Sequence, residues 1–486
     1  MSEHVETTTG VVRGIPENGV TVFRGIPYAA PLRGPLRFQA PGPATVWDGV
    51  RDARSFGASV PQPEHPQAPR AGADPECLTV NVWTPRTGDG DLPVMVWLHG
   101  GGFVAGSATS PDFDGTALAR HGVVLVSVNY RVGYEGFGWV DDAPCNRGVL
   151  DQLAALRWVR ANIAGFGGDP GMVTVFGQSA GAASIATLVA GGHADGLFRR
   201  AIVQSPGNVF RPVDEARTVS AMITDELGVR PTAEALAAVP PEAVHAVQWN
   251  PVLVMSAEPG AWTHPHSPYT FVLDGGLLGE RPWEAIRRSG AGRSVDLICG
   301  STADEARLYT AGQEPAAADP VRAARSVGLD PAAVPDYRRA RPGITDADLT
   351  ASMASDAMFR MPARWCARAH AGIGGRTYLY EFAWAVNPAV GACHGLDVPF
   401  TFGVPDGPLG ADLFGATVPA AFAPLSAAMR DAWVSFARTG DPGWPRYRPD
   451  DWPARIWELP PSVRADPTET SGAIWARRYR GGRVTA

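Results

Sequence analysis

A serine flanked by two glycines carries the strongest chemical signal in the chain. Residues 177–181 read Gly-Gln-Ser-Ala-Gly, follow a β-rich run at residues 173–176 and precede a helix of small residues at 182–190. In this strand–turn–helix setting the serine occupies a sharp, strained turn, where side chains in place of the glycines would clash. The dipole of the following helix favours negative charge beside it. The pattern therefore predicts that Ser179 is a nucleophile.

A run of three glycines supplies a second signal. Residues 99–103 read His-Gly-Gly-Gly-Phe and come directly after an apolar run at residues 94–98. The absence of side chains at glycine lets backbone N–H groups approach a substrate oxygen closely, as an oxyanion hole requires. Alone, such a triplet is more often a flexible turn. Upstream of the serine motif, it predicts an oxyanion hole.

A serine nucleophile needs a base, and the chain order in this kind of site is serine, then acid, then histidine. His394 lies in a tight, glycine-containing loop at residues 391–397, after a predicted strand at residues 378–382, and is the predicted base. The pair His264 and His266 has no accompanying carboxylate cluster, so we expect a loop there rather than a metal site. Other histidines in the right order have unremarkable surroundings: His193, His245 and His370.

The third member should be a carboxylate that orients the histidine. The apolar run at residues 295–299 predicts a core strand, and it leads to the adjacent acids Asp304 and Glu305. Adjacent side chains generally point in different directions, so only one of the two can face the imidazole. The residue pattern alone leaves both open.

The hydrophobic pattern predicts a scaffold that brings these residues together. Short apolar runs predict buried parallel strands at residues 94–98, 123–128, 173–176, 201–204 and 295–299. Apolar positions at three- and four-residue steps predict a helix at residues 149–163. This alternation is typical of an α/β fold with a doubly wound, mostly parallel central sheet. Before it, β-rich runs at residues 11–13 and 20–23 around Asn18-Gly19 predict an N-terminal β-hairpin.

The chain of 486 residues has no internal repeat and no linker polar enough to separate two domains. We therefore expect a single domain over residues 1–486. Two Pro- and Ala-rich stretches with weak periodicity, near residues 210–290 and 310–375, predict cap-like insertions that shape the pocket.

Composition excludes several classes of function. The chain contains no lysine, so all 42 Lys+Arg positions are arginine, and P-loop, pyridoxal and Ser-Lys chemistries lack their lysine. A net charge of −7 provides no basic field for nucleic acid, and no run approaches the roughly 18 apolar residues of a membrane span. Five cysteines without a C-x-x-C unit suit a reducing compartment and argue against a structural zinc. The acidic, polar start is unlike a secretory leader, so we expect a cytoplasmic protein unless a leader was removed.

Short segments spread over nearly the whole chain carry a further pattern: FRGIPYA at residues 23–29, LRF at 36–38, WDGVRDA at 47–53, NVWTP at 81–85, NYRVG at 129–133, FGGDP at 166–170 and FARTGDP at 436–442. With the serine and glycine motifs, they make the chain resemble the type-B carboxylesterases. This α/β-hydrolase group includes the bacterial para-nitrobenzyl esterases and the cholinesterases. The resemblance implies an α/β-hydrolase fold with helical cap insertions, in a protein of bacterial type.

Carried over position by position, the resemblance implies a catalytic triad of Ser179 as nucleophile, Glu305 as acid and His394 as general base. It leaves Asp304 to cap the following turn or helix. The resemblance further implies an oxyanion hole made by the N–H groups of Gly101, Gly102 and Ala180, and a structural ion pair between Arg131 and Asp151.

The chain departs from the family pattern near its N-terminus. Val60 stands where the family often has a cysteine that pairs with Cys77, so Cys77 is expected to be a free thiol. Pro75 stands where a glutamate usually bridges to Arg37. Glu76 and Asp74 are the candidates to replace that glutamate: both stay open. Two more departures, Glu135 and Pro206, are candidates for pocket residues.

The resemblance implies a serine carboxylesterase that hydrolyses small to medium carboxylic esters through an acyl-enzyme, with no metal or organic cofactor. The expected partner is a small-molecule ester. The oligomeric state, monomer or dimer, stays open. In one alternative the same triad acts on a thioester, carbamate, lactone or aryl ester in a biosynthetic or detoxifying pathway. A panel of acyl chains and leaving groups would distinguish the two. In the other alternative, a non-catalytic cholinesterase-like binding module, the serine would be lost, whereas this chain keeps it.

Overall fold

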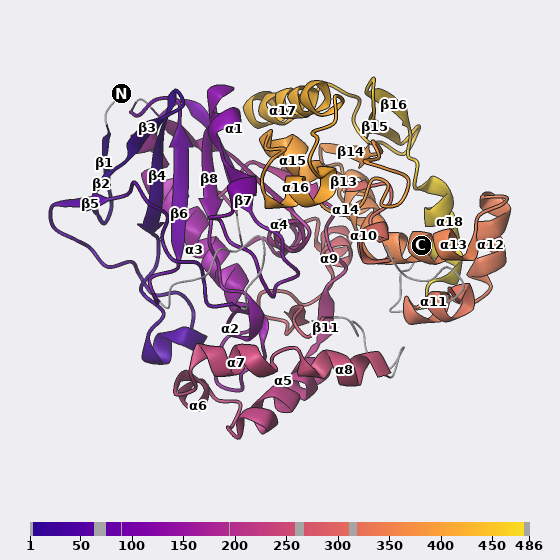
Figure 1. The fold of residues 1–486 in the computed structure, drawn as a ribbon, viewed down its shortest axis with the longest axis horizontal. Helices are drawn as coiled ribbons and strands as arrows, with labels where there is room; N and C mark the ends of the chain where they lie inside the picture. Colours follow the sequence, from indigo (N-terminus) through magenta and orange to yellow (C-terminus); the bar gives the residue numbers. More distant parts are fainter. Residues whose placement is uncertain are drawn as a thin grey trace.

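The computed structural model describes residues 3–62, 74–88, 90–193, 195–257, 267–310 and 318–480. Within these residues the centre of the molecule is one large twisted sheet (Figure 1). Its strands follow the order β16 (Ser462–Ala465), β15 (Pro453–Trp457), β14 (Thr377–Phe382), β13 (Asp296–Thr302), β10 (Arg200–Gln204), β9 (Gly168–Gln178), β7 (Leu92–Leu98), β8 (Val124–Val128), β6 (Thr79–Thr84), β4 (Val20–Pro27) and β3 (Ile15–Glu17). Neighbours from β15 to β8 pair in parallel, and the pairs at either end are antiparallel. The predicted mostly parallel α/β sheet is confirmed.

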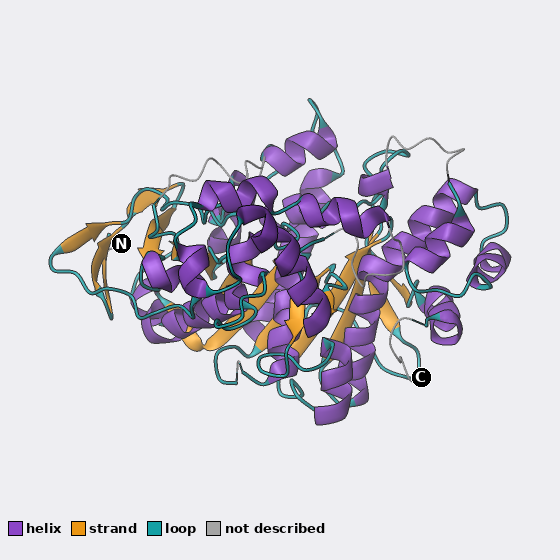
Figure 2. Cartoon of the chain, turned by 90° about the horizontal axis from the view of Figure 1, so that it is seen from below, coloured by secondary structure: helices purple, strands orange, loops and turns teal. Residues whose placement is uncertain are grey.

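Helices cover both faces of this sheet (Figure 2). Packed on one face are α3 (Arg147–Asn162), α4 (Ala180–Gly191), α9 (Pro282–Ser289) and α14 (Met361–Gly372). The other face carries α1 (Thr116–Arg120), α15 (Asp397–Phe402), α16 (Pro408–Phe414) and α17 (Phe422–Thr439).

Strand β7 shows how the sheet joins the two layers. Val94, Val96 and Leu98 belong to the core under α3 and α4, whereas Met95 and Trp97 belong to the core under α17. Side chains alternate between faces along a strand, and both faces are covered here. A continuous apolar run is therefore what β7 needs.

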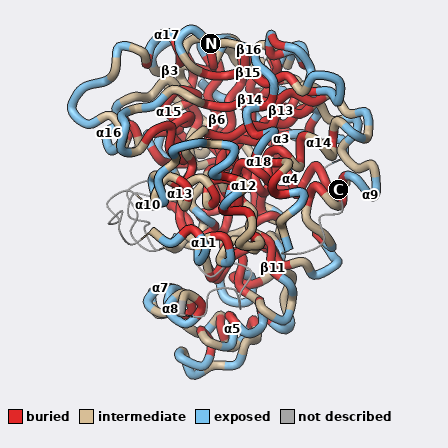
Figure 3. The backbone as a smooth tube through the Cα atoms, turned by 90° about the vertical axis from the view of Figure 1, so that its right-hand side faces the viewer, coloured by how far each residue is buried: buried red, intermediate tan, exposed pale blue. Residues whose placement is uncertain are grey.

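The two weakly patterned stretches form mainly short helices. The first contains α5 (Val213–Leu227), α6 (Ala233–Ala237), α7 (Pro241–Val247) and α8 (Asn250–Ala257). The second contains α10 (Arg307–Thr310), α11 (Pro320–Ser326), α12 (Ala333–Ala340), α13 (Asp346–Ser355) and a π-helical turn, η5 (Asp356–Arg360), and α11 to α13 pack with α18 (Glu469–Arg478). Helices α5, α7 and α8 lie together at one end of the molecule (Figure 3), and each contributes a buried apolar side chain: Ile223, Val244 and Met255.

The N-terminal hairpin is present at the predicted turn and the second predicted arm is correct, but the first arm is a different strand from the predicted one. The turn is Asn18-Gly19, with positive φ at both residues, as a tight hairpin needs. Its arms, however, are β3 and β4, whereas Val11–Val12 of β2 (Gly10–Arg13) pair with β1 (His4–Thr7) and β5 (Val50–Asp52) in a separate sheet. The strand Ile15–Glu17 was not predicted, because a proline at its centre, Pro16, argues against a strand. It forms nevertheless because β3 is the edge strand of the sheet, where the missing N–H of Pro16 costs no ladder hydrogen bond.

Strands β11 (Phe210–Pro212) and β12 (Phe271–Leu273) form a two-stranded parallel sheet, and the short helix α2 (Gly133–Phe137) follows β8. No helix among the described residues is long and apolar enough to span a membrane. The five cysteines, Cys77, Cys145, Cys299, Cys366 and Cys393, are free thiols in the described residues.

Candidate active site

The sheet topology brings the predicted catalytic residues to one edge. Strands β14, β13, β10, β9 and β7 are parallel neighbours in that order, so their carboxyl ends lie side by side. Ser179 follows β9, Glu305 lies three residues after β13, and His394 is in the loop after β14. The glycine-rich loop follows β7. Residues more than 200 positions apart in sequence thus meet at one place.

The turn that carries Ser179 is strained, as the motif predicts. Ser179 has φ 57° and ψ −119°, a backbone conformation that side-chain-bearing residues rarely adopt. A Cβ atom at Gly181 would lie 2.0 Å from the carbonyl oxygen of Leu98, and one at Gly177 would lie 2.6 Å from the same oxygen. The two glycines therefore let the turn pack directly against the end of β7. Helix α4 begins at Ala180, so the first N–H groups of the helix point toward the serine.

Glu305, not Asp304, faces His394. The Oε2 atom of Glu305 lies 2.5 Å from Nδ1 of His394, and the N–H of His394 donates to the carbonyl of Glu305 at 3.1 Å. The Glu305 side chain is fully buried and the His394 side chain is 8% exposed. A carboxylate at Nδ1 takes that N–H, so Nε2 carries the lone pair that a general base needs.

A further residue, Ser205, holds the acid in place. It follows β10, the strand between β9 and β13, and its hydroxyl donates to Oε1 of Glu305 at 2.5 Å. The N–H of Thr302 donates to the same oxygen at 2.8 Å. The sequence analysis did not single out Ser205 and named only its neighbour Pro206, as a candidate pocket residue. The position of Ser205 directly after a predicted core strand was the one signal in the sequence that it lies at the same sheet edge as Ser179 and Glu305.

Gln178 contacts the ring nitrogen of His394 that does not face Glu305. Its amide nitrogen lies 3.1 Å from Nε2 of His394. Within the described residues, no hydrogen bond joins Ser179 to His394. The structure thus brings Glu305 and His394 together directly, and brings Ser179 to them through its neighbour Gln178. Catalytic hydrogen bonds are often loose before substrate binds. The sequence analysis missed Gln178, although it occupies the variable position of the serine motif.

Two aromatic side chains cover the imidazole. Phe359 is stacked on His394 with ring centroids 4.0 Å apart, and Tyr309 lies at 5.9 Å. Phe359 belongs to the π-helical turn η5, a rare geometry that is frequent at functional sites. These contacts restrict the ring to the plane in which Nδ1 meets Glu305.

The glycine-rich loop lies against Ser179. A Cβ atom at Gly100 would be 3.3 Å from Cβ of Ser179, and one at Gly101, where φ is 115°, would be 1.9 Å from the carbonyl oxygen of Ala105. Only glycine fits this close approach. His99, at the start of the loop, is buried and stacked on Tyr130, and burial lowers its pKa to about 4. His99 is therefore neutral and acts as packing beneath the loop.

Asp304 does not cap a helix, contrary to the prediction. Its Oδ2 atom accepts the N–H of Ala392 at 3.1 Å, and its own N–H donates to the carbonyl of Ala392 at 2.9 Å. Helix α10 begins at Arg307, and the turn before it runs alongside the loop between β14 and α15, which carries His394 and is called the histidine loop below. Asp304 thus accepts a backbone N–H, as expected of it, but from the loop that carries His394.

The remaining histidines lie elsewhere. His370 is buried on α14, where Nδ1 contacts Oγ1 of Thr377 at 2.8 Å and Nε2 contacts the carbonyl of Gly292 at 3.0 Å. Burial lowers the pKa of His370. These contacts give it a structural role. His264 and His266 lie outside the described residues.

Two buried ion pairs stabilise the core beside the site. Arg131 and Asp151 form a bidentate pair, at 2.8 Å from Nε to Oδ2 and 2.6 Å from Nη2 to Oδ1. Arg37 pairs with Glu135, at 2.6 Å from Nη2 to Oε1. The expectation that Glu76 or Asp74 would pair with Arg37 is therefore wrong.

Glu76 instead pairs with Arg51. Glu135 lies on α2, and its carboxylate is occupied by Arg37, whose Nη1 also donates to the carbonyls of Ala237 and Val239 near α6. The ion pair therefore connects the N-terminal segment, α2 and the end of α6. It also explains why an acid is tolerated in an otherwise apolar segment.

Replacing Glu135 by alanine should destabilise the fold by about 3–5 kcal/mol, because it leaves the buried Arg37 guanidinium without its counter-charge. The matched control is Glu76→Ala, since its pair with Arg51 is about a third exposed and should contribute about 1 kcal/mol or less. Chemical denaturation of both variants measures the difference. Equal losses in the two variants would show that Glu135 is not the buried partner of Arg37.

Comparison with known proteins places these features among carboxylic ester hydrolases. A model of the Carboxylesterase family matches residues 1–329 and 336–469. Para-nitrobenzyl esterase of Bacillus subtilis is 35% identical over 485 residues, covering 95% of this chain and 96% of the relative. Phenmedipham hydrolase of Pseudarthrobacter oxydans is 35% identical over 470 residues, covering 92% and 93%. A carboxylesterase structure from Geobacillus stearothermophilus superposes with a TM-score of 0.86 at 35% identity, covering 97% of this chain and 100% of that chain.

Proposed function

The chain belongs to the carboxylesterase family and is a serine carboxylesterase, and we propose that it hydrolyses small to medium neutral esters with Ser179, His394 and Glu305 as its triad. The observation that carries the proposal is the short contact between Glu305 and Nδ1 of His394. It orients Nε2 toward the turn that bears Ser179, through Gln178.

In the proposed mechanism Ser179 attacks the ester carbonyl while Nε2 of His394 takes the hydroxyl proton. The amide of Gln178 must give up its contact with Nε2 when the serine hydroxyl donates there. Glu305 fixes the tautomer of the imidazole and stabilises the imidazolium. His394 then returns the proton to the leaving alcohol, and a water activated by the same histidine hydrolyses the acyl-enzyme.

The negative charge that develops on the carbonyl oxygen needs donors that do not have to reorganise. We assign them to the N–H groups of Gly101, Gly102 and Ala180. The close packing of the glycine loop against Ser179 supports this assignment, as does the position of Ala180 at the start of α4. No step in this mechanism calls for a metal or an organic cofactor.

The surroundings of the site favour a neutral substrate. The acids around His394 are engaged: Glu305 contacts His394 itself, and Asp397 is fully buried and hydrogen-bonded. The ring of His394 is flanked by Phe359 and Tyr309, and Tyr309 is half exposed. Apolar groups of an ester can pack against these rings, whereas a charged group finds no free counter-charge among them.

The test is a panel of p-nitrophenyl esters with matched acyl lengths, comparing neutral butyrate with negatively charged hemisuccinate. We expect kcat/KM to be at least about tenfold higher for the neutral ester, equivalent to about 1.4 kcal/mol. A preference for the charged ester would contradict the proposed substrate class. The panel also includes carbamates, one of the alternative substrate classes for the same triad.

A further inference from the structure

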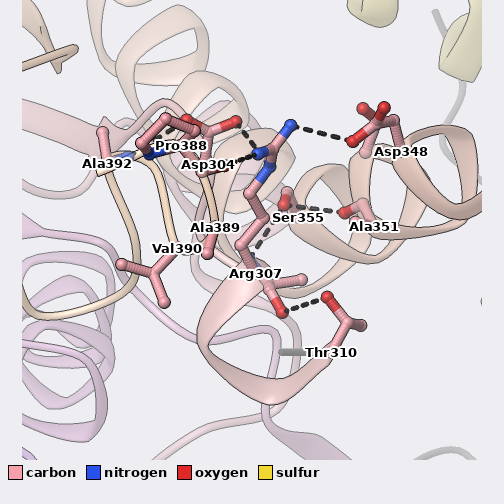
Figure 4. A network of polar contacts seen from close by, with 12 residues as sticks. Asp304, Arg307, Thr310, Asp348, Ala351, Ser355, Pro388, Ala389, Val390 and Ala392 are labelled. Carbon is pink, nitrogen blue, oxygen red and sulfur yellow. Dashed lines mark hydrogen bonds and ion pairs between the residues drawn. The ribbon is translucent and has the colours of Figure 1, made fainter. Parts of the chain in front are cut away.

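We propose that Arg307 is a positioning residue for the Glu305–His394 pair. Its guanidinium joins three segments: the turn that carries Glu305, the loop that carries His394, and helix α13 of the second helical stretch (Figure 4). The proposal rests on the triad proposed above. It adds to that triad the side chain that keeps Glu305 and His394 in their relative positions.

The acid turn and the histidine loop are first joined by backbone contacts. Asp304 and Ala392 exchange two hydrogen bonds, one from each N–H, at 2.9 and 3.1 Å. The N–H of His394 donates to the carbonyl of Glu305 at 3.1 Å. Any shift of the loop at Ala392 is therefore transmitted directly to the catalytic contact two residues away.

Arg307 adds side-chain contacts to these backbone contacts and so restrains the acid turn, the loop after β14 and α13. Its Nη1 donates to the carbonyl of Pro388, in the first part of the histidine loop, at 2.9 Å. Its Nε lies 3.4 Å from Oδ1 of Asp304, while the other oxygen of that carboxylate holds Ala392. Its Nη2 donates to Oδ1 of Asp348 on α13 at 2.9 Å. The planar guanidinium can serve three acceptors at once, which a single ammonium group serves poorly.

The same turn is tied to the aromatic cover of the imidazole. The N–H of Ala306 donates to the hydroxyl of Ser355 at 2.9 Å. Ser355 ends α13 and directly precedes η5, whose Phe359 is stacked on His394. Arg307 and Ala306 therefore hold α13 at two points, and through it they hold the ring that covers the histidine. The contacts of Arg307 and Ala306 therefore position the imidazole of His394 in two ways: at its edge through Glu305, and at its face through Phe359.

This arrangement predicts a loss of catalysis that exceeds the loss of stability. Arg307 and its partners Asp304 and Asp348 are roughly 29–44% exposed, and ion pairs of this kind contribute little to folding. By contrast, a displacement of about 1 Å in a catalytic group can cost about 10²-fold in rate. Because Arg307 does not contact the reacting atoms, its removal should change kcat rather than the binding of substrate.

The test compares the full-length Arg307→Ala, Arg307→Lys and Arg338→Ala variants on p-nitrophenyl butyrate. We expect Arg307→Ala to lower kcat about 10- to 100-fold, to leave KM within about threefold, and to lower the thermal midpoint by only about 2 °C. Arg307→Lys should recover part of the lost kcat. Arg338, which pairs with the exposed Asp346 at the start of α13, is the matched control and should keep wild-type kcat.

A kcat for Arg307→Ala within about twofold of wild type would overturn the proposal, as would an equal loss in Arg338→Ala. If Arg307→Ala does not fold, Arg307→Lys decides: wild-type kcat in that variant would contradict the need for a three-way contact. Ser179→Ala measured in parallel distinguishes a failure of the proposed triad from a failure of the positioning role of Arg307. Activity that survives Ser179→Ala contradicts the proposed triad, whereas loss there with normal Arg307 variants contradicts only the positioning role.

Discussion

Replacing Ser179 by alanine is expected to abolish ester turnover down to a residual rate roughly 10³–10⁴-fold above that in water. The variant loses the nucleophile but keeps the oxyanion donors and the binding surface, which account for the residual rate. The fold should be unchanged, because alanine removes only the hydroxyl and leaves the strained turn between Gly177 and Gly181. The measurement is kcat for p-nitrophenyl butyrate together with the thermal midpoint.

The matched control is Ser435→Ala. Ser435 is a serine on α17 whose hydroxyl donates to the carbonyl of Asp441 at the surface, and its variant should keep wild-type kcat. Turnover by Ser179→Ala within about tenfold of wild type would mean that another group attacks the ester.

The second large effect is expected at Glu305. Glu305→Gln should lower kcat about 10³–10⁴-fold with the fold intact, because an amide in this position no longer fixes the imidazole with its lone pair on Nε2. Ser205 and the N–H of Thr302 both donate to Oε1, so they would hold the amide oxygen there and turn its NH₂ group toward His394. Titration of kcat/KM against pH in both enzymes measures the loss over the whole range.

The adjacent acid provides the internal control. Asp304→Asn keeps an oxygen that can accept the N–H of Ala392, so its kcat should stay within about tenfold of wild type, equivalent to about 1.4 kcal/mol of barrier. The opposite ranking of the two variants would show that the acid has been assigned to the wrong residue.

The sequence predicted the scaffold well where local pattern and burial agree. The run at residues 94–98 became most of β7, and the run at residues 295–299 became the start of β13, because a strand covered on both faces needs unbroken apolar residues. The serine motif likewise predicted a strained turn, because the strand, the Gly-x-Ser-x-Gly turn and the helix follow one another directly in the chain. Such features depend on short stretches of chain.

Features that depend on long-range partners could not be predicted. Val11–Val12 and Val20–Val22 have similar strand patterns, and nothing local says that the first pairs with β1 rather than with β4. The partner of Arg37 lies 98 residues away on α2. It could not be distinguished from the nearer acid Glu76 by charge alone.

The same limit applied inside the site. Gln178 and Ser205 are polar residues of ordinary type, and their contacts with His394 and Glu305 depend on how β9, β10 and β13 lie next to one another. The sequence supplied the order of the motifs along the chain. Only the order of the strands in space shows which side chains share the sheet edge.

Covalent labelling tests the central claim most directly. The wild-type enzyme would be treated with an organophosphate ester, and the modified peptide located by mass spectrometry while activity is followed. We expect one adduct per chain, on Ser179, formed in step with the loss of activity, and no adduct in Ser179→Ala. Complete inactivation with the adduct on a different residue, or with Ser179 unmodified, would contradict the assignment of Ser179 as the nucleophile.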